Sequence, residues 1–66
     1  MRVTVNGEAR VFGGSVTVSD LVAAEAASPR GVAVAVNAEL VPRSVWAATA
    51  VADGDRIELL TAAQGG

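Results

Sequence analysis

The sequence contains no cysteine, histidine, tyrosine or lysine, and each absence excludes a kind of chemistry. Without cysteine there is neither a disulfide framework nor a thiol nucleophile. Without histidine, the serine and threonine hydroxyls lack the usual base that activates them for covalent catalysis. Without lysine there is no side-chain amine for a Schiff base or an isopeptide bond. These absences argue against an enzyme.

Basic charge and long apolar runs are also scarce. The formal net charge is −2, and all five basic residues are arginines spread along the chain, so the basic stripe of a nucleic-acid-binding protein is missing. No apolar run approaches the roughly 20 residues that a membrane-spanning helix needs. The first residues show no basic region followed by an apolar stretch, as a secretory signal would. We therefore expect a cytoplasmic protein with no nucleic-acid or membrane partner.

Small aliphatic residues dominate what is present. Of the 66 residues, 52% are hydrophobic, mostly valine and alanine, and only 3% are aromatic. A chain of about 60 residues removes only about 60% of its unfolded surface from water, so we expect one small domain. Valine packs well on a pleated surface, which favours strands. We predict a single domain over residues 1–61 and a flexible tail at 62–66.

The first half of the chain predicts a hairpin followed by a helix. Residues 2–5 alternate between polar and apolar, Asn6-Gly7 is a strong signal for a tight hairpin turn, and residues 8–12 return as a second strand. Thr17, followed three residues later by Asp20, resembles a partial capping box. It begins a helix of about ten residues with an apolar stripe, which must pack on a sheet.

The second half predicts three more strands. Val32–Val36 is apolar throughout, as in a central strand. Leu40-Val41 reads as a short edge strand that Pro42 stops, and the next seven residues read as a single helical turn. A tight turn then leads into a last strand at 56–61.

This order of elements predicts a two-layer α+β domain. We expect the β-grasp, ubiquitin-like arrangement, in which a mixed sheet of four to five strands packs on one main helix and the first and last strands lie side by side. Phe12 and Trp46 are expected at the margins of the core. The predicted core is Val3, Val5, Val18, Leu21, Val22, Val32, Val34, Val36, Leu40, Ile57 and Leu59.

The carboxylates that lie closest together in the sequence belong to a turn. Asp53 and Asp55 flank Gly54, and aspartate and glycine favour turns because of local hydrogen bonding and backbone freedom. Two carboxylates also provide too few oxygen ligands for calcium. We therefore predict no metal site and no acid–base pair here.

The remaining reactive candidate is the carboxylate of Gly66. It is ionised at neutral pH, and a carboxylate of this kind can attack the α-phosphate of ATP to give an acyl-adenylate. Gly65 and Gly66 have no Cβ, so they leave the carbonyl unshielded and let the backbone approach a partner closely. With Gln64, they would enter a partner's active site. Taken alone, the glycines fit an inert, frayed end better than a reactive one, because chain termini are often glycine-rich and loose.

A docking face follows from the alternation of the last strand. If Ile57 and Leu59 point into the core, then Arg56, Glu58 and Leu60 point outward, and Arg2 of the first strand faces the same side. This surface is either a docking face for partners or an ordinary solvated sheet face.

Several short motifs occur in the same order as in one known protein family. They are "TVSDL" at the predicted helix start, "VAVAVN" before the turn, Val41-Pro42-Arg43-x-x-Trp46, Asp53-Gly54-Asp55, and the final Gly65-Gly66. Over nearly the whole chain, this order and spacing is similar to the sulfur carrier proteins of thiamine biosynthesis, the ThiS family.

The resemblance implies a carrier rather than a catalyst, with no bound cofactor. It implies that an adenylating enzyme related to ubiquitin activators uses ATP on Gly66. A desulfurase system would then supply sulfur, leaving a thiocarboxylate that donates the sulfur to thiazole synthase. Three alternatives stay open: a β-grasp carrier for molybdopterin or cysteine synthesis, an interaction module with an inert tail, and a tag conjugated to lysines.

Overall fold

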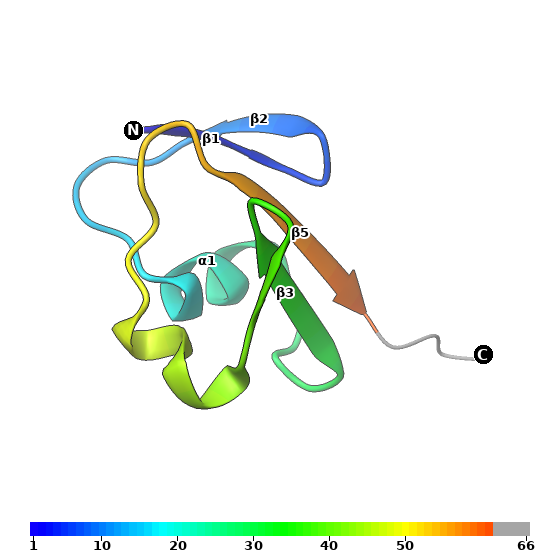
Figure 1. Cartoon of the computed structure of the whole chain (residues 1–66). Coiled ribbons are helices and arrows are strands. Elements are labelled where there is room, and N and C mark those ends of the chain that lie inside the picture. The colour runs from blue at the N-terminus through cyan, green and yellow to red at the C-terminus, as the bar shows by residue number, and fades with distance from the viewer. Residues whose placement is uncertain (62–66) are drawn as a thin grey trace.

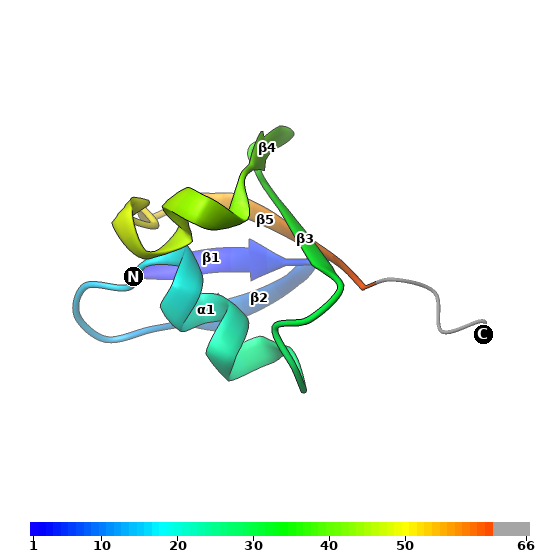
Figure 2. The same ribbon diagram turned by 90° about the horizontal axis from the view of Figure 1, so that it is seen from below.

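Five strands form one mixed sheet with a helix across one face (Figures 1 and 2). The computed structural model describes residues 1–61. Its strands are β1 (Arg2–Val5), β2 (Glu8–Val11), β3 (Val32–Val36), β4 (Glu39–Val41) and β5 (Arg56–Thr61), and its helices are α1 (Val18–Glu25) and the 3₁₀ helix η1 (Arg43–Ala48). The predicted β-grasp arrangement is therefore confirmed, with five strands. The predicted tail at 62–66 lies outside the described residues.

The first and last strands are neighbours in the middle of the sheet, as predicted. The strand order is β2-β1-β5-β3-β4. β1 runs parallel to β5, and every other neighbouring pair is antiparallel. Parallel neighbours need a long crossover connection, and here α1, β3, β4 and η1 all lie in that connection.

The hairpin turn forms because two residues accept a left-handed backbone. Asn6 has φ of 51° and Gly7 has φ of 84°, the positive values that a type I′ turn requires at both central positions. Val5 then pairs with Glu8, which fixes the register of β1 against β2. The predicted turn is confirmed, and β2 ends at Val11, one residue earlier than expected.

A complete capping box begins α1. The Asp20 backbone N–H donates to Thr17 Oγ1 at 3.1 Å, and the Thr17 backbone N–H donates to Asp20 Oδ2 at 3.0 Å. Aspartate thus performs the role that glutamate or glutamine performs more often. The helix has eight residues rather than about ten, because the chain becomes extended at Ala26 (φ −104°, ψ 144°).

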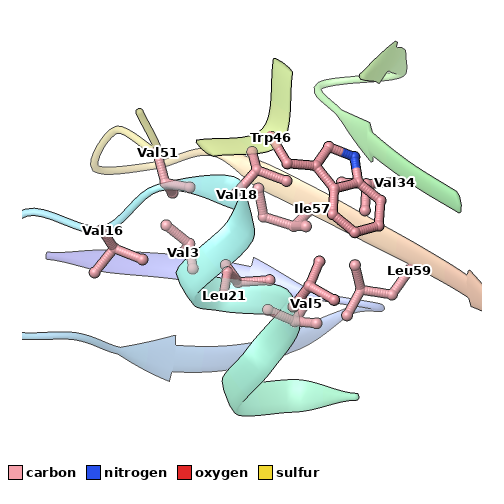
Figure 3. Close-up of a cluster of buried hydrophobic side chains, with 11 residues drawn as sticks. Val3, Val5, Val16, Val18, Leu21, Val34, Trp46, Val51, Ile57 and Leu59 are labelled. Carbon is pink, nitrogen blue, oxygen red and sulfur yellow. The ribbon is translucent and has the colours of Figure 1, made fainter. Parts of the chain in front are cut away.

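The core lies between the sheet and the two helices (Figure 3). Its buried residues are Val3, Val5, Val16, Val18, Leu21, Val22, Val34, Trp46, Val51, Ile57 and Leu59. Val32, Val36 and Phe12 are half-buried against this cluster. Val16 and Val51 were not predicted because they stand outside any periodic segment. They are brought together by a hydrogen bond from the Val51 N–H to the Val16 carbonyl, at 2.8 Å.

Two core predictions were wrong in opposite directions. Leu40 is 71% exposed, because β4 turns Val41 toward the core and therefore turns Leu40 outward. Trp46 is only 5% exposed and belongs to the core rather than its margin. Its indole Nε1–H donates to the Val41 carbonyl at 3.0 Å, and the Arg43 guanidinium lies 5.2 Å from the ring centroid.

Instead of one turn, η1 runs for six residues, which is about two turns of a 3₁₀ helix.

The Asp53-Gly54-Asp55 segment is a turn, as predicted. Gly54 has φ of 89°, a conformation that glycine adopts without strain. Asp53 Oδ1 accepts the Arg2 backbone N–H at 2.7 Å, and Asp55 Oδ2 accepts the Ala52 backbone N–H at 2.8 Å. Both carboxylates therefore accept hydrogen bonds from backbone N–H groups around this turn. Within residues 1–61, neither helix is long and apolar enough to cross a membrane.

Replacing Thr17 with alanine is expected to lower the free energy of unfolding by about 1 kcal/mol, because the Asp20 N–H loses its acceptor at the helix start. Urea unfolding followed by circular dichroism measures this change. Ser19→Ala is the matched control, since Ser19 lies in the same turn without a capping role. Equal effects of the two changes would show that the box contributes nothing.

Candidate functional site

The strand that leads toward Gly66 is an interior strand of the sheet. β5 pairs with β3 over five positions, from Val36↔Ile57 to Val32↔Thr61, and with β1 on its other side. The last described residue, Thr61, is therefore still held by the sheet. Gln64, Gly65 and Gly66 lie outside the described residues, so the reactive carboxylate remains a prediction.

The side chain of Asn6 extends the contact between β1 and β5. The backbone pairing of these strands covers only Thr4↔Arg56 and Val5↔Ile57. Beyond it, Asn6 Oδ1 accepts the Leu59 N–H at 2.8 Å, and Asn6 Nδ2 donates to the Leu59 carbonyl at 3.2 Å. One amide side chain thus bonds both backbone groups of Leu59, as a further strand residue would. The sequence reading assigned Asn6 only to the turn.

The predicted docking residues all lie exposed on the sheet face opposite the helices. Arg56, Glu58 and Leu60 alternate along β5 with the buried Ile57 and Leu59. Alternate residues on a strand are about 6.6 Å apart, so these three form one row.

Arg2 does not sit directly beside this row. Thr4 is the residue of β1 that pairs with Arg56, so Arg2 lies one step farther from the tail-bearing end of β5. Both salt bridges found within residues 1–61 involve Arg10, so Arg2, Arg56 and Glu58 have no ion-pair partner in this part of the chain. Their charges are available to a partner surface.

Leu40 adds a large apolar side chain to this face on the β3–β4 side of Leu60. The register places Leu60 opposite Ala33, and Leu40 opposite Ala35. We call Ala33, Ala35, Leu40 and Leu60 the apolar patch. Because the two alanines between them are small, both leucines stand clear of the sheet, with exposed fractions of 71% for Leu40 and 67% for Leu60. No periodic signal in the sequence identifies Leu40 as an outward residue, because the predicted strand Leu40-Val41 is too short to show an alternation.

The described residues do not supply the ligands of a metal site. No group of three or more histidine, cysteine, aspartate or glutamate side chains comes together within residues 1–61. Both carboxylate oxygens of Asp55 already accept hydrogen bonds, Oδ1 from Asn37 Nδ2 at 3.0 Å and Oδ2 from the Ala52 backbone N–H at 2.8 Å. The features that distinguish the described surface are therefore the exposed charges and the apolar patch beside the end of β5.

A five-stranded mixed sheet in this order, wrapped on one main helix, defines the class of small ubiquitin-like β-grasp proteins. The model of the ThiS family matches residues 3–66, and the chain therefore belongs to the ThiS family. Members of this family are small sulfur carriers of thiamine biosynthesis rather than catalysts.

Two solved structures support the same assignment. The crystal structure of a thiamine biosynthesis protein, ThiS, from Geobacter metallireducens is 38% identical, covers both chains completely and superimposes with a TM-score of 0.85. An NMR solution structure of a thiamine biosynthesis protein from the same organism is 36% identical, with a TM-score of 0.82. It covers 100% of this chain and 88% of that one.

A further relative is much longer. The chain is 42% identical over all 66 residues to a thiazole synthase from Paramagnetospirillum magneticum (strain ATCC 700264 / AMB-1). It spans only 20% of the length of that protein. A sequence like this one is therefore present within a longer polypeptide that is named a thiazole synthase.

Replacing Asn6 with alanine is expected to lower the free energy of unfolding by about 1–3 kcal/mol, because both backbone groups of Leu59 lose their partners and alanine is strained at positive φ. Asn6→Asp separates these causes, since aspartate tolerates this conformation and keeps the acceptor for the Leu59 N–H. Hydrogen exchange at the Leu59 amide is expected to speed up in Asn6→Ala and to stay slower in Asn6→Asp. Unchanged exchange in both variants would contradict this role.

Proposed function

We propose that the chain carries sulfur for the thiazole ring of thiamine as a thiocarboxylate on Gly66. The observation that carries this proposal is the ThiS-family match over residues 3–66, which includes the final Gly65-Gly66. Thiamine is favoured over the other sulfur-carrier pathways because the similar structures are named thiamine biosynthesis proteins and the longer relative is named a thiazole synthase.

The proposed cycle begins on a partner enzyme. A carboxylate oxygen of Gly66 attacks the α-phosphate of ATP, and pyrophosphate leaves. A desulfurase system draws sulfur from cysteine as a persulfide, whose outer sulfur displaces AMP from the acyl carbonyl. A thiol of the partner then cleaves the resulting acyl disulfide, so that a disulfide forms on the partner and a thiocarboxylate is left on Gly66. Thiazole synthase takes the sulfur, and an oxygen atom from its substrate or from water replaces it and returns the carboxylate. The partner must bind the nucleotide, since the sequence has no G-x-x-x-x-G-K phosphate loop of its own.

The folded domain contributes a rigid base and a surface that partners recognise. β5 is paired with β3 as far as Thr61, so the point at which the described chain ends is fixed relative to the outer sheet face. A partner that docks on the apolar patch and on Arg2, Arg56 and Glu58 would thereby receive Gly66 within a limited distance of this docking face. Glycine at the last two positions suits a narrow entrance because it carries no side chain.

The direct test is intact mass spectrometry after incubation with the cognate adenylating enzyme, ATP and a sulfur donor. We expect replacement of one oxygen atom by sulfur, and fragmentation is expected to place the sulfur on Gly66. Omitting ATP is the control, and it is expected to leave the mass unchanged. An unchanged mass with an enzyme that is active on its other substrates would contradict the proposal.

The docking role of the apolar patch has a separate test. Leu60→Ser is expected to weaken binding to the adenylating enzyme by about 10- to 150-fold, because a leucine that would be buried in the complex contributes about 1.5–3 kcal/mol. Leu40→Ser is expected to act in the same direction. Val45→Ser is the control, since Val45 is also exposed but lies on η1. Titration calorimetry measures the three affinities, and a loss with Val45→Ser equal to that with Leu60→Ser would argue against this face.

A further inference from the structure

An open groove lies on the helix side of the sheet, beside the end of α1. The helix stops at Glu25, and this end of α1 lines an open hollow together with residues of β1, β2 and β5. The resulting cavity has a volume of about 350 Å³. Val5 and Leu59, which lie at the end of the buried cluster toward which β5 runs, form an apolar part of its lining (Figure 3). We call it the helix-end groove.

Three charged side chains form a connected network in the lining of this groove. Arg10 Nη2 donates to Glu8 Oε1 at 3.0 Å, and Arg10 Nε donates to Glu25 Oε1 at 3.3 Å. The pKa of Arg10 is raised, first by the hydrogen bond to Glu8 and then by that to Glu25, so its charge is retained. Each glutamate thus uses Oε1, and Oε2 of each takes part in no hydrogen bond within residues 1–61.

The side chains that line the groove carry a net negative charge. Two carboxylates and one guanidinium sum to one negative charge. The carboxyl end of α1 adds a partial negative charge, and the last turn of the helix contains no basic residue. A lining that is apolar in part and also carries acidic groups suits an arginine or lysine side chain, whose aliphatic stem packs on carbon while its head meets carboxylates.

We propose that the helix-end groove binds an arginine or lysine side chain of the adenylating enzyme. This inference rests on the proposed function. Thr61, the last described residue of β5, lines the groove, so an enzyme that engages the following residues is brought beside it. Such an enzyme must also bind the polyanionic ATP with cationic groups, and an acidic groove complements a surface of that charge. The groove lies across the sheet from the apolar patch and would form a second contact.

Charge-changing variants separate this role from a merely structural one. Glu8→Gln and Glu25→Gln are each expected to weaken binding to the adenylating enzyme about 3- to 5-fold. Arg10→Gln leaves both carboxylates uncompensated and is expected to tighten binding by a similar factor. Glu39→Gln is the matched control, because Glu39 is exposed on β4 at the opposite edge of the sheet. The differences are expected to shrink as salt is raised.

Titration calorimetry on variants whose urea midpoints have been checked gives these affinities. Weaker binding for Arg10→Gln, in parallel with the two glutamate variants, would show that the network only supports the fold and would overturn the proposal. Equal affinities for all four variants would overturn it as well. The same titrations with thiazole synthase test the choice of partner, because a response confined to the synthase would contradict the assignment.

A probe of the groove alone needs no enzyme. Arginine amide, titrated into ¹⁵N-labelled protein, is expected to shift the amide signals of Glu25, Ala26, Leu59 and Thr61, and Glu25→Gln is expected to reduce these shifts. Citrulline amide, which has an uncharged side chain of similar shape, is expected to cause no shift of these amide signals. Shifts spread evenly over all acidic residues would overturn the groove as a site. Because this readout is independent of sulfur loading, its outcome is distinguishable from failure of the proposed function.

Discussion

The parallel contact between β1 and β5 is the constraint on which the rest of the structure depends. It joins residues more than 50 positions apart through only two backbone pairs, Thr4↔Arg56 and Val5↔Ile57, and the Asn6 side chain lengthens it to Leu59. Every other element lies in the connection between these strands. The core can close only when both ends of the domain have met, and this meeting also fixes where the chain leaves the sheet.

Along β5, residues that stabilise the core alternate with residues that are exposed to partners. Ile57 and Leu59 are buried with Val3, Val34 and Leu21, so the inward residues of this strand hold the domain together. The outward residues contribute little to the core, and they are free to display charge and the apolar patch. The helix-end groove lies on the other side of the same strand end. Two surfaces of different character therefore converge on the residues that lead toward Gly66.

Patterns of period two and the turn residues predicted the fold well, because backbone preferences and burial act together in those segments. The proposal of Gly66 as the site followed from an inventory of missing reactive groups and from the family resemblance. The burial of Leu40 and Trp46 was predicted wrongly. A predicted strand of two residues shows no alternation, and a single tryptophan outside a periodic segment does not indicate which way its side chain points. The bonds from Asn6 to Leu59 join residues 53 apart in sequence, and local patterns contain no information about such partners.

The central claim is that the domain presents the Gly66 carboxylate for loading with sulfur. A semisynthetic chain whose final carboxylate is converted to an amide tests it most directly, because every residue and the whole fold are otherwise kept. The account predicts an unchanged urea midpoint, retained binding to the adenylating enzyme, and no ATP-dependent gain of sulfur. Sulfur loading of the amidated chain at the wild-type rate would contradict it.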